Sequence, residues 1–177
     1  MAELRVVTTD ELSEPELEEL RALMVTSFAD EFAEEDWVNT LGGRHAIVTA
    51  QGIVVSHAAL VERRLAAGKR ALRAGYVEGV ATLSEHRRQG YGAMAMRALQ
   101  GLITDGYDVG GLSTGAHHFY ERLGWERWQG RTFVDAPNGQ ERTPEDDDGV
   151  MVLRSPRTVD LDLTTDLVCD WRPGEVW

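Results

Sequence analysis

The sequence has a single cysteine, Cys169, which excludes an internal disulfide and disfavours a cysteine-based metal site. No apolar run approaches the roughly 20 residues of a membrane-spanning helix. The N-terminus lacks the basic-then-apolar pattern of a secretion signal. Internal repeats and low-complexity segments are also missing. With 42% hydrophobic and 27% charged residues, the chain is neither disordered, collagen-like nor a coiled coil. These features predict a cytoplasmic protein.

The 177 residues are enough for one domain with a sizeable core, because domains of this length bury about 70% of their unfolded-chain surface. We therefore expect a single domain over residues 1–177. Proline is scarce, with five residues.

Basic residues are outnumbered overall, and the formal net charge is −12. This charge argues against nucleic acids and anionic membranes as partners. Residues 10–36 and 145–148 are strongly acidic, whereas residues 62–97 carry an excess of arginine and lysine. Ordinary solvated surface charge would explain any one of these residues, but the pattern also suits one anionic and one cationic ligand.

Hydrophobic periodicity and turn residues predict an α/β fold with a mixed, largely antiparallel sheet flanked by helices. The predicted strands are Glu3–Thr8, His45–Ala50, Ile53–Leu65, Arg70–Thr82, Asp108–Ser113, Trp125–Val134, Val150–Leu153, Asp160–Leu163 and Val168–Trp171. One predicted helix begins at Ser13-Glu14. Three others cover Glu34–Thr40, Gly90–Thr104 and Ala116–Leu123. Residues 136–149 read as a turn-rich acidic loop.

The turn Arg87-Arg-Gln-Gly-Tyr-Gly92 joins a predicted strand to a predicted helix. Backbone N–H groups in such a turn, together with the helix N-terminus, favour an anion. Gly90 and Gly92 permit close backbone approach, and the two arginines supply positive charge. The chemistry suits a pyrophosphate, although a plain helix-capping turn would give a similar pattern.

Gly79 interrupts the strand before this turn, which suggests a bulge or the close approach of another backbone. A strand edge beside a pyrophosphate site could pair with a ligand that carries amides, as in strand addition. Pantetheine joined to a pyrophosphate has this chemistry, so coenzyme A is the inferred ligand.

The motif Arg87-x-x-Gly90-x-Gly92, followed by Phe119-Tyr-Glu-Arg-Leu-Gly-Trp125, resembles the GNAT superfamily of acyl-CoA N-acyltransferases. Further segments are similar to the aminoglycoside 2'-N-acetyltransferases, over nearly the whole chain. They are Asp36-Trp37, Thr40–Gly43, Gly75–Val80, Asp146–Gly149 and Cys169-Asp-Trp-Arg172 through Trp177. Glu31 and Glu175 stand where this family carries aspartate, and the loop Ser113–Ala116 is slightly shorter.

The resemblance implies a GNAT-type fold and acetyl transfer from acetyl-CoA to the 2'-amino group of aminoglycosides, with antibiotic resistance as the result. It also implies a homodimer, and the mechanism needs no metal. Aminoglycosides are polycations, so the acidic segments would suit them as acceptors.

Acetyl transfer to an amine requires a proton acceptor and a group that holds the thioester carbonyl. We assign Glu78 as substrate ligand and general base, acting through a water, and the Val80 N–H as the donor to the thioester carbonyl. The resemblance places Tyr120 beside the sulfur as the acid for the departing thiolate. A surface carboxylate and a core aromatic are the alternative interpretations of Glu78 and Tyr120.

The cofactor-binding set is Val80, Ala81, Thr82, Arg87, Arg88, Gln89, Gly90, Tyr91 and Gly92. The substrate-binding set carried over by resemblance is Glu31, Asp36, Glu78, Gly79, Ser113, Asp146, Asp147, Glu175 and Trp177. Which carboxylates of residues 145–148 face a substrate is left open. The aromatic C-terminal residue suggests a docked tail, and a tail so short should carry little of the core burial.

The five histidines, His45, His57, His86, His117 and His118, lack metal-ligand spacing with carboxylates. Cys169 is interpreted as a buried apolar residue. Two other functions remain open: a GNAT enzyme acting on a peptide or polyamine, and a non-catalytic binder of acyl-CoA or polycations.

Overall fold

The computed structural model describes residues 1–177. Its helices are α1 (Glu14–Phe28), α2 (Glu34–Thr40), α3 (Tyr91–Gly106) and α4 (His117–Glu121). Its strands are β1 (Ala2–Thr8), β2 (Arg44–Ala50), β3 (Ile53–Ala67), β4 (Arg70–Thr82), β5 (Val109–Ser113), β6 (Glu126–Arg127), β7 (Thr132–Ala136), β8 (Gly139–Arg142), β9 (Val150–Arg154) and β10 (Leu167–Asp170). The α/β fold with a mixed sheet is as predicted. No helix is both long and apolar enough to cross a membrane.

The contacts divide the chain into two compact units, each made of two segments. The first comprises Met1–Val61 and Val77–Gly101, and the second comprises Glu62–Tyr76 and Leu102–Trp177. Strands β3 and β4 and helix α3 contribute residues to both units. The expectation of one domain stays a prediction.

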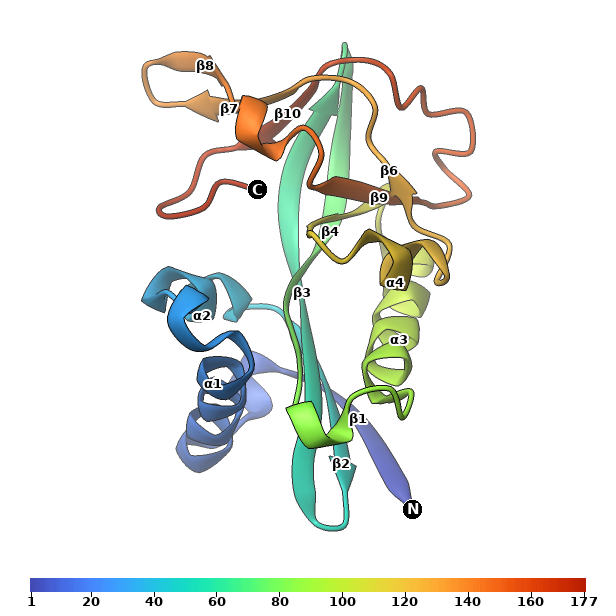
Figure 1. Cartoon of the computed structure of the whole chain (residues 1–177). Coiled ribbons are helices and arrows are strands. Elements are labelled where there is room, and N and C mark those ends of the chain that lie inside the picture. Colours follow the sequence, from blue (N-terminus) through green and yellow to red (C-terminus); the bar gives the residue numbers. More distant parts are fainter. The chain divides into compact units, whose positions relative to one another are not determined.

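In the first unit, β2 pairs antiparallel with β1 and with β3. Figure 1 shows α1 and α2 on one side of these strands, with the first turns of α3 on the other. Helix α1 begins as predicted at a capping box: the backbone N–H and the hydroxyl of Ser13 donate to Glu16, at 2.8 and 2.7 Å. Buried Leu20, Leu23 and Met24 then pack this helix into the core.

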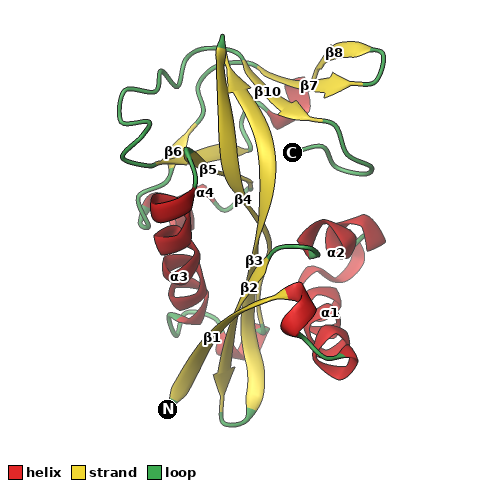
Figure 2. Cartoon of the chain, turned by 180° about the vertical axis from the view of Figure 1, so that it is seen from behind, coloured by secondary structure: helices red, strands yellow, loops and turns green.

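In the second unit, β5 runs parallel to Ala74–Tyr76 of β4 and antiparallel to β9, which also pairs with β6. Strand β10 runs parallel to β7 and antiparallel to the end of β3, and β7 forms a hairpin with β8. Figure 2 shows β7, β8 and β10 together as one end of the sheet of this unit.

Three predictions in the second unit are wrong. Trp125–Val134 is not one strand: β6 pairs with β9 and β7 with β10. A Cβ at Gly130 would lie 1.8 Å from the carbonyl oxygen of Thr165, so the chain passes tightly against another backbone there instead of extending. The predicted loop over residues 136–149 contains β8, which the two-residue turn Pro137-Asn138 joins to β7.

Asp160–Leu163 is not a strand either. Its two leucines are buried, but the N–H of Leu161 bonds back to the carbonyl of Thr158 at 3.0 Å, as in a turn. Alternating apolar residues here reflect burial of a loop rather than strand pairing.

Candidate functional site

Strand β4 is distorted at Gly79, between the predicted base Glu78 and the predicted amide donor Val80. Gly79 has a φ of +56°, in the left-handed region that favours glycine. A Cβ there would lie 2.7 Å from Cγ2 of Thr40 and 3.1 Å from Met24. The predicted distortion is confirmed, although the close neighbours are side chains and not another backbone. Glu78 itself is half-buried.

The backbone after the bulge is partly occupied by internal hydrogen bonds. The Ala81 carbonyl accepts from the Ser56 hydroxyl at 2.9 Å, and that hydroxyl also bonds the Thr82 hydroxyl at 2.8 Å. The Thr82 carbonyl accepts from Nε of Arg87 at 3.2 Å. The carbonyl of Thr82, a residue of the predicted cofactor-binding set, therefore already has a partner within the protein.

The turn before α3 has the backbone of an anion site. Arg88 and Gly90 have φ values of +62° and +88°, and no atom lies within 4 Å of where a Cβ on Gly90 would stand. The Gly90 carbonyl accepts from the N–H of Met94 at 2.9 Å, so α3 starts directly at this glycine. The first N–H groups of the helix have no partner within the helix, and the positive end of the helix dipole lies at this turn.

The side chains of this turn divide into bonded and free groups. Arg87 donates to the carbonyl oxygens of Thr82 and Ser27, and Gln89 donates to that of Glu85 at 3.1 Å. Arg88 is exposed and makes no hydrogen bond or ion pair. Of the two arginines, Arg88 is therefore the one available for a phosphate, while Arg87 braces the turn.

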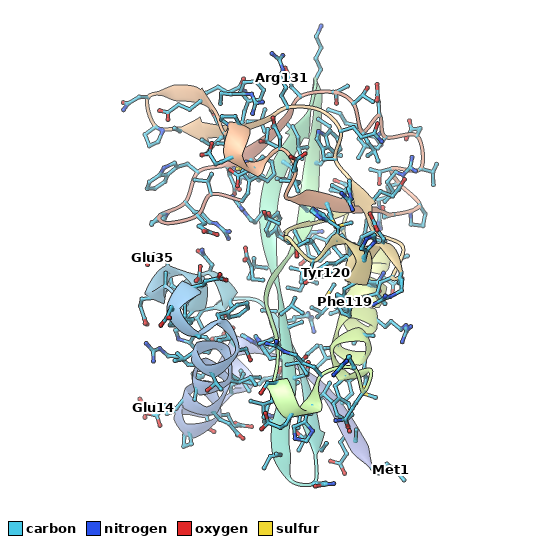
Figure 3. The ribbon with its side chains drawn as sticks, in the orientation of Figure 1. Met1, Glu14, Glu35, Phe119, Tyr120 and Arg131 are labelled. Atoms are coloured by element: carbon cyan, nitrogen blue, oxygen red, sulfur yellow. The ribbon has the colours of Figure 1, made fainter.

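Tyr120 lies on α4 in the second unit, beside Phe119, and Figure 3 labels both side chains. The Tyr120 ring packs edge-on against Phe119 and Trp125, with centroids 4.9 and 6.3 Å apart. Burial raises the pKa of its hydroxyl to about 12, partly offset by a hydrogen bond with the Thr114 side chain. The phenol is therefore protonated at neutral pH and can act as a proton donor.

Asp146 is the half-buried carboxylate of the acidic segment 145–148. Burial, together with the charges of Glu145 and Glu175, raises its pKa to about 6. A carboxylate held among other acids in this way is stabilised by a nearby cation. Ser113, at the end of β5, lies beside the end of this acidic segment. A Cβ on Gly149 would lie 2.9 Å from the Ser113 Oγ, and the Gly149 N–H donates to the Asp146 carbonyl.

Asp147, the next residue, has a different environment. Its carboxylate forms a bidentate ion pair with Arg142 and accepts from the N–H and hydroxyl of Thr132, both at 2.9 Å. The Arg142 hydrogen bonds are the main reason its pKa falls to about 2. Asp147 thus ties the segment to the β7–β8 hairpin, and its direct contact with a substrate stays a prediction.

The last residues of the chain are docked, as predicted. Trp177 is 4% exposed, and its indole N–H donates to Oγ1 of Thr143 at 3.0 Å. The expectation that this tail carries little burial is wrong, because an aromatic ring of this size fills a core position. Glu175, within the same segment, is exposed.

Two arginines that the sequence reading missed hold this tail. Arg63, 4% exposed, donates to the carbonyls of Val176 and Asp170, both at 2.6 Å. Arg172 donates from Nε to the Glu175 carbonyl at 2.7 Å, and both guanidinium groups lie over the Tyr76 ring. The available signal for Arg63 was its place between Val61 and Leu65, which lie on the same face of strand β3.

The remaining substrate candidates lie in the first unit. Glu31 is exposed at the end of a short 3₁₀ turn. Asp36 accepts from the N–H of Ala33 at 2.9 Å and so caps α2. Figure 3 shows Glu14 and Glu35 on the outer side of the helices that carry this acidic segment.

The candidate site residues form two sets, one in each compact unit. The first unit contains Glu31, Asp36, Glu78–Thr82 and 87–92, and the second contains Ser113, Tyr120, Asp146, Asp147, Glu175 and Trp177. No group of three or more His, Cys, Asp or Glu residues is placed to hold a metal ion. Cys169 is buried, as predicted, and burial raises the pKa of its thiol to about 11.

Comparison with known proteins extends this description. Residues 8–128 match the acetyltransferase (GNAT) domain family. The chain is 41% identical to an aminoglycoside 2'-N-acetyltransferase of Mycolicibacterium fortuitum over 177 residues, covering 98% of this chain and 91% of that protein.

Two solved structures show the same fold. A GNAT family N-acetyltransferase from Escherichia coli, in complex with CoA, has a TM-score of 0.70 at 18% identity, over 97% of this chain and 89% of that one. A GCN5-related N-acetyltransferase from Kribbella flavida has a TM-score of 0.59 at 25% identity, over 73% of this chain and 34% of that one. The resemblance read from the sequence is thereby confirmed, and this chain belongs to the GNAT acetyltransferase family.

Proposed function

We propose that this protein is an aminoglycoside 2'-N-acetyltransferase that uses acetyl-CoA as the acetyl donor. The observation that carries the proposal is the 41% identity to such an enzyme over nearly the full length of both chains. The free arginine of the basic turn and the raised pKa of Asp146 support it independently, since they suit an anionic donor and a cationic acceptor.

Acetyl-CoA binds at the bulged strand and the turn that follows it. Its pyrophosphate accepts hydrogen bonds from the N–H groups of residues 88–92 and from the Arg88 guanidinium. Its pantetheine arm runs along the backbone of Val80 and Ala81. Because Arg87 already bonds Thr82, its contribution is to keep the turn in shape.

Glu78 takes the proton of the acceptor ammonium through a water, which leaves a neutral amine as the nucleophile. The amine nitrogen attacks the thioester carbonyl carbon, and the Val80 N–H stabilises the negative oxygen that develops. The C–S bond then breaks as the carbonyl re-forms, and Tyr120 donates its proton to the departing thiolate. The amide nitrogen releases its second proton to solvent, and Tyr120 regains a proton from solvent. Burial keeps the Tyr120 hydroxyl protonated at neutral pH, because it raises the pKa to about 12.

Further carboxylates bind the other ammonium groups of the acceptor. Asp146 is the best supported, because burial and the charges of Glu145 and Glu175 raise its pKa, and a bound cation would favour its ionised form. Glu31, Asp36, Gly79, Ser113 and Trp177 complete the proposed set. Asp147 contributes negative charge while its oxygens hold the hairpin.

A cytoplasmic enzyme of this kind would protect its host, because acetylation removes a positive charge from the drug. We propose resistance as the biological consequence, and a homodimer as the working state. Size-exclusion chromatography with light scattering tests the homodimer, and drug susceptibility of a host expressing the Glu78→Gln variant tests resistance.

The decisive experiment incubates the purified protein and acetyl-CoA with an aminoglycoside that has a 2'-amino group. Mass spectrometry should show the addition of one acetyl group, and NMR should place it on the 2'-nitrogen. A matched aminoglycoside with a 2'-hydroxyl is the control and should remain unmodified. If peptides or polyamines release the thiol of CoA as fast as aminoglycosides do, or faster, the protein is better described as a GNAT enzyme for those amines. If no amine releases the thiol, it is better described as a non-catalytic binding protein.

A further inference from the structure

Two fully buried histidines of the first unit lie directly behind the bulge in β4. His45 on β2 and His57 on β3 are both 0% exposed. Nδ1 of His45 is 2.9 Å from Nε2 of His57, and the rings are stacked with centroids 5.2 Å apart. Neither ring takes part in the acetyl transfer described above.

The pair is the middle of a longer chain of hydrogen bonds. At one end, Nδ1 of His57 is 2.9 Å from the carbonyl oxygen of Gly79. At the other end, Nε2 of His45 is 2.8 Å from Oγ1 of Thr9, which accepts from the N–H of Gly42 at 2.9 Å. The chain therefore connects the loop before β2 to the bulge in β4.

The hydrogen bond to the Gly79 carbonyl determines which ring nitrogens of His57 and His45 carry hydrogen. A carbonyl oxygen can only accept, so Nδ1 of His57 carries hydrogen. Burial lowers the pKa of both histidines, to about 4 for His45 and about 3 for His57, so each ring is neutral at pH 7. Nε2 of His57 must then accept from Nδ1 of His45. Nε2 of His45 accepts in turn from the Thr9 hydroxyl.

All of these bonds point toward the Gly79 carbonyl. Hydrogen bonds aligned in one direction strengthen one another, by about 10–30% per bond. The carbonyl of Gly79 and the N–H of Val80 belong to the same peptide group. A bond to the carbonyl increases the C=N character of that group and therefore the acidity of its N–H.

The same bond also fixes where the Val80 N–H points. The chain has no cis peptide, so this N–H is directed opposite to the Gly79 carbonyl and away from His57. Gly79 has a positive φ, and because it has no Cβ its backbone is freer to rotate than that of an ordinary strand residue. The imidazole of His57 is the donor that holds this peptide in one orientation.

We propose that His57, aligned by His45, is a positioning residue that orients and polarises the Val80 N–H as the donor to the thioester carbonyl. The inference rests on the role of Val80 in the proposed function. The histidines do not conduct the proton of the acceptor, because the chain ends on a carbonyl that has no proton to pass on.

A matched pair of variants separates the two bonds of His57. In His57→Asn, the side-chain amide nitrogen can occupy the position of Nδ1 and still donate to Gly79. In His57→Gln, the amide reaches the position of Nε2 and can still bond His45, but the donor to Gly79 is lost. Removing an oxyanion donor costs ~10²–10³ in turnover. Misdirecting one should lower the kcat of the Gln variant by about tenfold, with the KM for acetyl-CoA within about twofold.

The stretching frequency of the thioester carbonyl gives a readout that a purely structural role would not move. Infrared spectra of bound acetyl-CoA, labelled with ¹³C at the carbonyl, should show a lowered frequency in the wild-type protein. The Asn variant should keep most of this shift, and the Gln variant should lose most of it. An unchanged shift in a folded Gln variant would overturn the proposal.

The measurement needs no acceptor, so it is independent of the aminoglycoside assignment. If acetylation of aminoglycosides fails while the shift depends on His57, the inference stands and the acceptor is different. If wild-type protein binds acetyl-CoA without any shift, the Val80 donor and this inference both fail.

Should both variants be unfolded, the wild-type protein still tests the proposal. Long-range ¹H–¹⁵N spectra distinguish the two neutral tautomers of histidine. Both buried histidines should carry hydrogen on Nδ1 at pH 7. Hydrogen on Nε2 of His57 would contradict the proposed direction of the chain.

Discussion

Asp146 and Asp147 are adjacent in the sequence, yet their carboxyl groups differ by several pKa units. Burial and the nearby Glu145 and Glu175 raise the pKa of Asp146 to about 6, whereas hydrogen bonds from Arg142 lower that of Asp147 to about 2. At the scale of single residues, the partners of a carboxylate therefore decide its role. Asp147 is already paired with the Arg142 guanidinium, whereas Asp146 lies near other acidic side chains, where a bound cation would stabilise its charge.

For Asp146, we predict that the affinity for the acceptor rises between pH 5 and pH 7. Below pH 6 the carboxyl is neutral and offers no charge to an ammonium group, and above pH 6 it is ionised. Titration calorimetry of the aminoglycoside in the absence of acetyl-CoA measures the effect. Asp146→Asn should weaken binding about tenfold at pH 7 and flatten the pH dependence. An unaltered pH profile in this variant would assign the effect to another group.

Asp147→Ala should act on stability instead. It removes the ion pair with Arg142 and two hydrogen bonds from Thr132, so the free energy of unfolding should fall by ~1–3 kcal/mol. Urea denaturation measures this change, and Asp148→Ala, at an exposed neighbour, serves as the control. Equal stability of the two variants would show that the network around Asp147 contributes little.

Glu78→Gln keeps the size of the side chain but removes its ability to take a proton. Turnover near neutral pH should fall by ~10²-fold or more, while the affinity for acetyl-CoA is retained. Steady-state kinetics over a range of pH, with the acetyl-CoA Kd measured separately, check both parts. A pH–rate profile identical to that of the wild type would exclude Glu78 as the base.

At the scale of elements, the two arginines of the turn before α3 differ in their hydrogen bonding. Arg87 bonds two backbone carbonyls, and Arg88 bonds nothing. Gly90 has a positive φ, and no atom lies within 4 Å of where its Cβ would stand. The proposed pyrophosphate site therefore has one arginine that bonds the protein backbone and one exposed arginine that does not.

Arg88→Ala should weaken acetyl-CoA binding by ~1.5–3 kcal/mol, the range for a charged hydrogen bond. The melting temperature without ligand should not change, because Arg88 makes no internal bond. Arg87→Ala should lower that melting temperature. The measurements are acetyl-CoA titration and thermal unfolding of both variants. A fall in stability with Arg88→Ala, or equal affinity in both variants and the wild type, would contradict this division of roles.

At the scale of the whole molecule, the net charge of −12 and its uneven distribution favour a polycationic acceptor. Salt screens such attraction, and the screening length shrinks to ~3 Å at molar ionic strength. The acceptor Kd should therefore rise at least about tenfold from low salt to 0.5 M salt. Glu175→Gln should reduce this salt dependence without the loss of burial that deleting Trp177 would cause. A salt-independent Kd would leave solubility as the reason for the acidic segments.

The buried histidine pair makes global stability depend on pH. Because burial lowers the pKa of His45 and His57 to about 4 and 3, the unfolded chain binds more protons below the ordinary value of about 6.5. The free energy of unfolding should be level above pH 7 and fall as the pH drops from 6.5 toward 4. Each histidine contributes up to about 1.4 kcal/mol per pH unit.

Urea denaturation at several pH values measures this slope. Asp146 acts in the opposite sense between pH 4 and 6, so the comparison of wild type with His57→Gln isolates the histidine contribution. His118→Gln, at an exposed histidine, is the control and should keep the full slope. A wild-type slope that equals that of His57→Gln would show that the ring is not buried in its neutral form.

Much of the fold could be predicted from local patterns. The helix Glu34–Thr40 and the strand Arg70–Thr82 have the predicted bounds, and the capping box at Ser13 forms as expected. These features depend on residues a few positions apart, where backbone propensity and side-chain caps act directly. The split of Trp125–Val134 could not be predicted, because it results from the approach of Thr165 to Gly130.

By itself, the sequence determined the family and the position of the basic turn before α3, because both are encoded in short motifs whose residues act together locally. Only the tertiary structure decided which acidic residue is available to a cation, which arginine is free, and what holds the chain terminus. These outcomes depend on contacts between residues far apart in the sequence, such as His57 with Gly79 and Arg63 with Val176. Burial and electrostatic environment arise from such contacts, and no local pattern contains them.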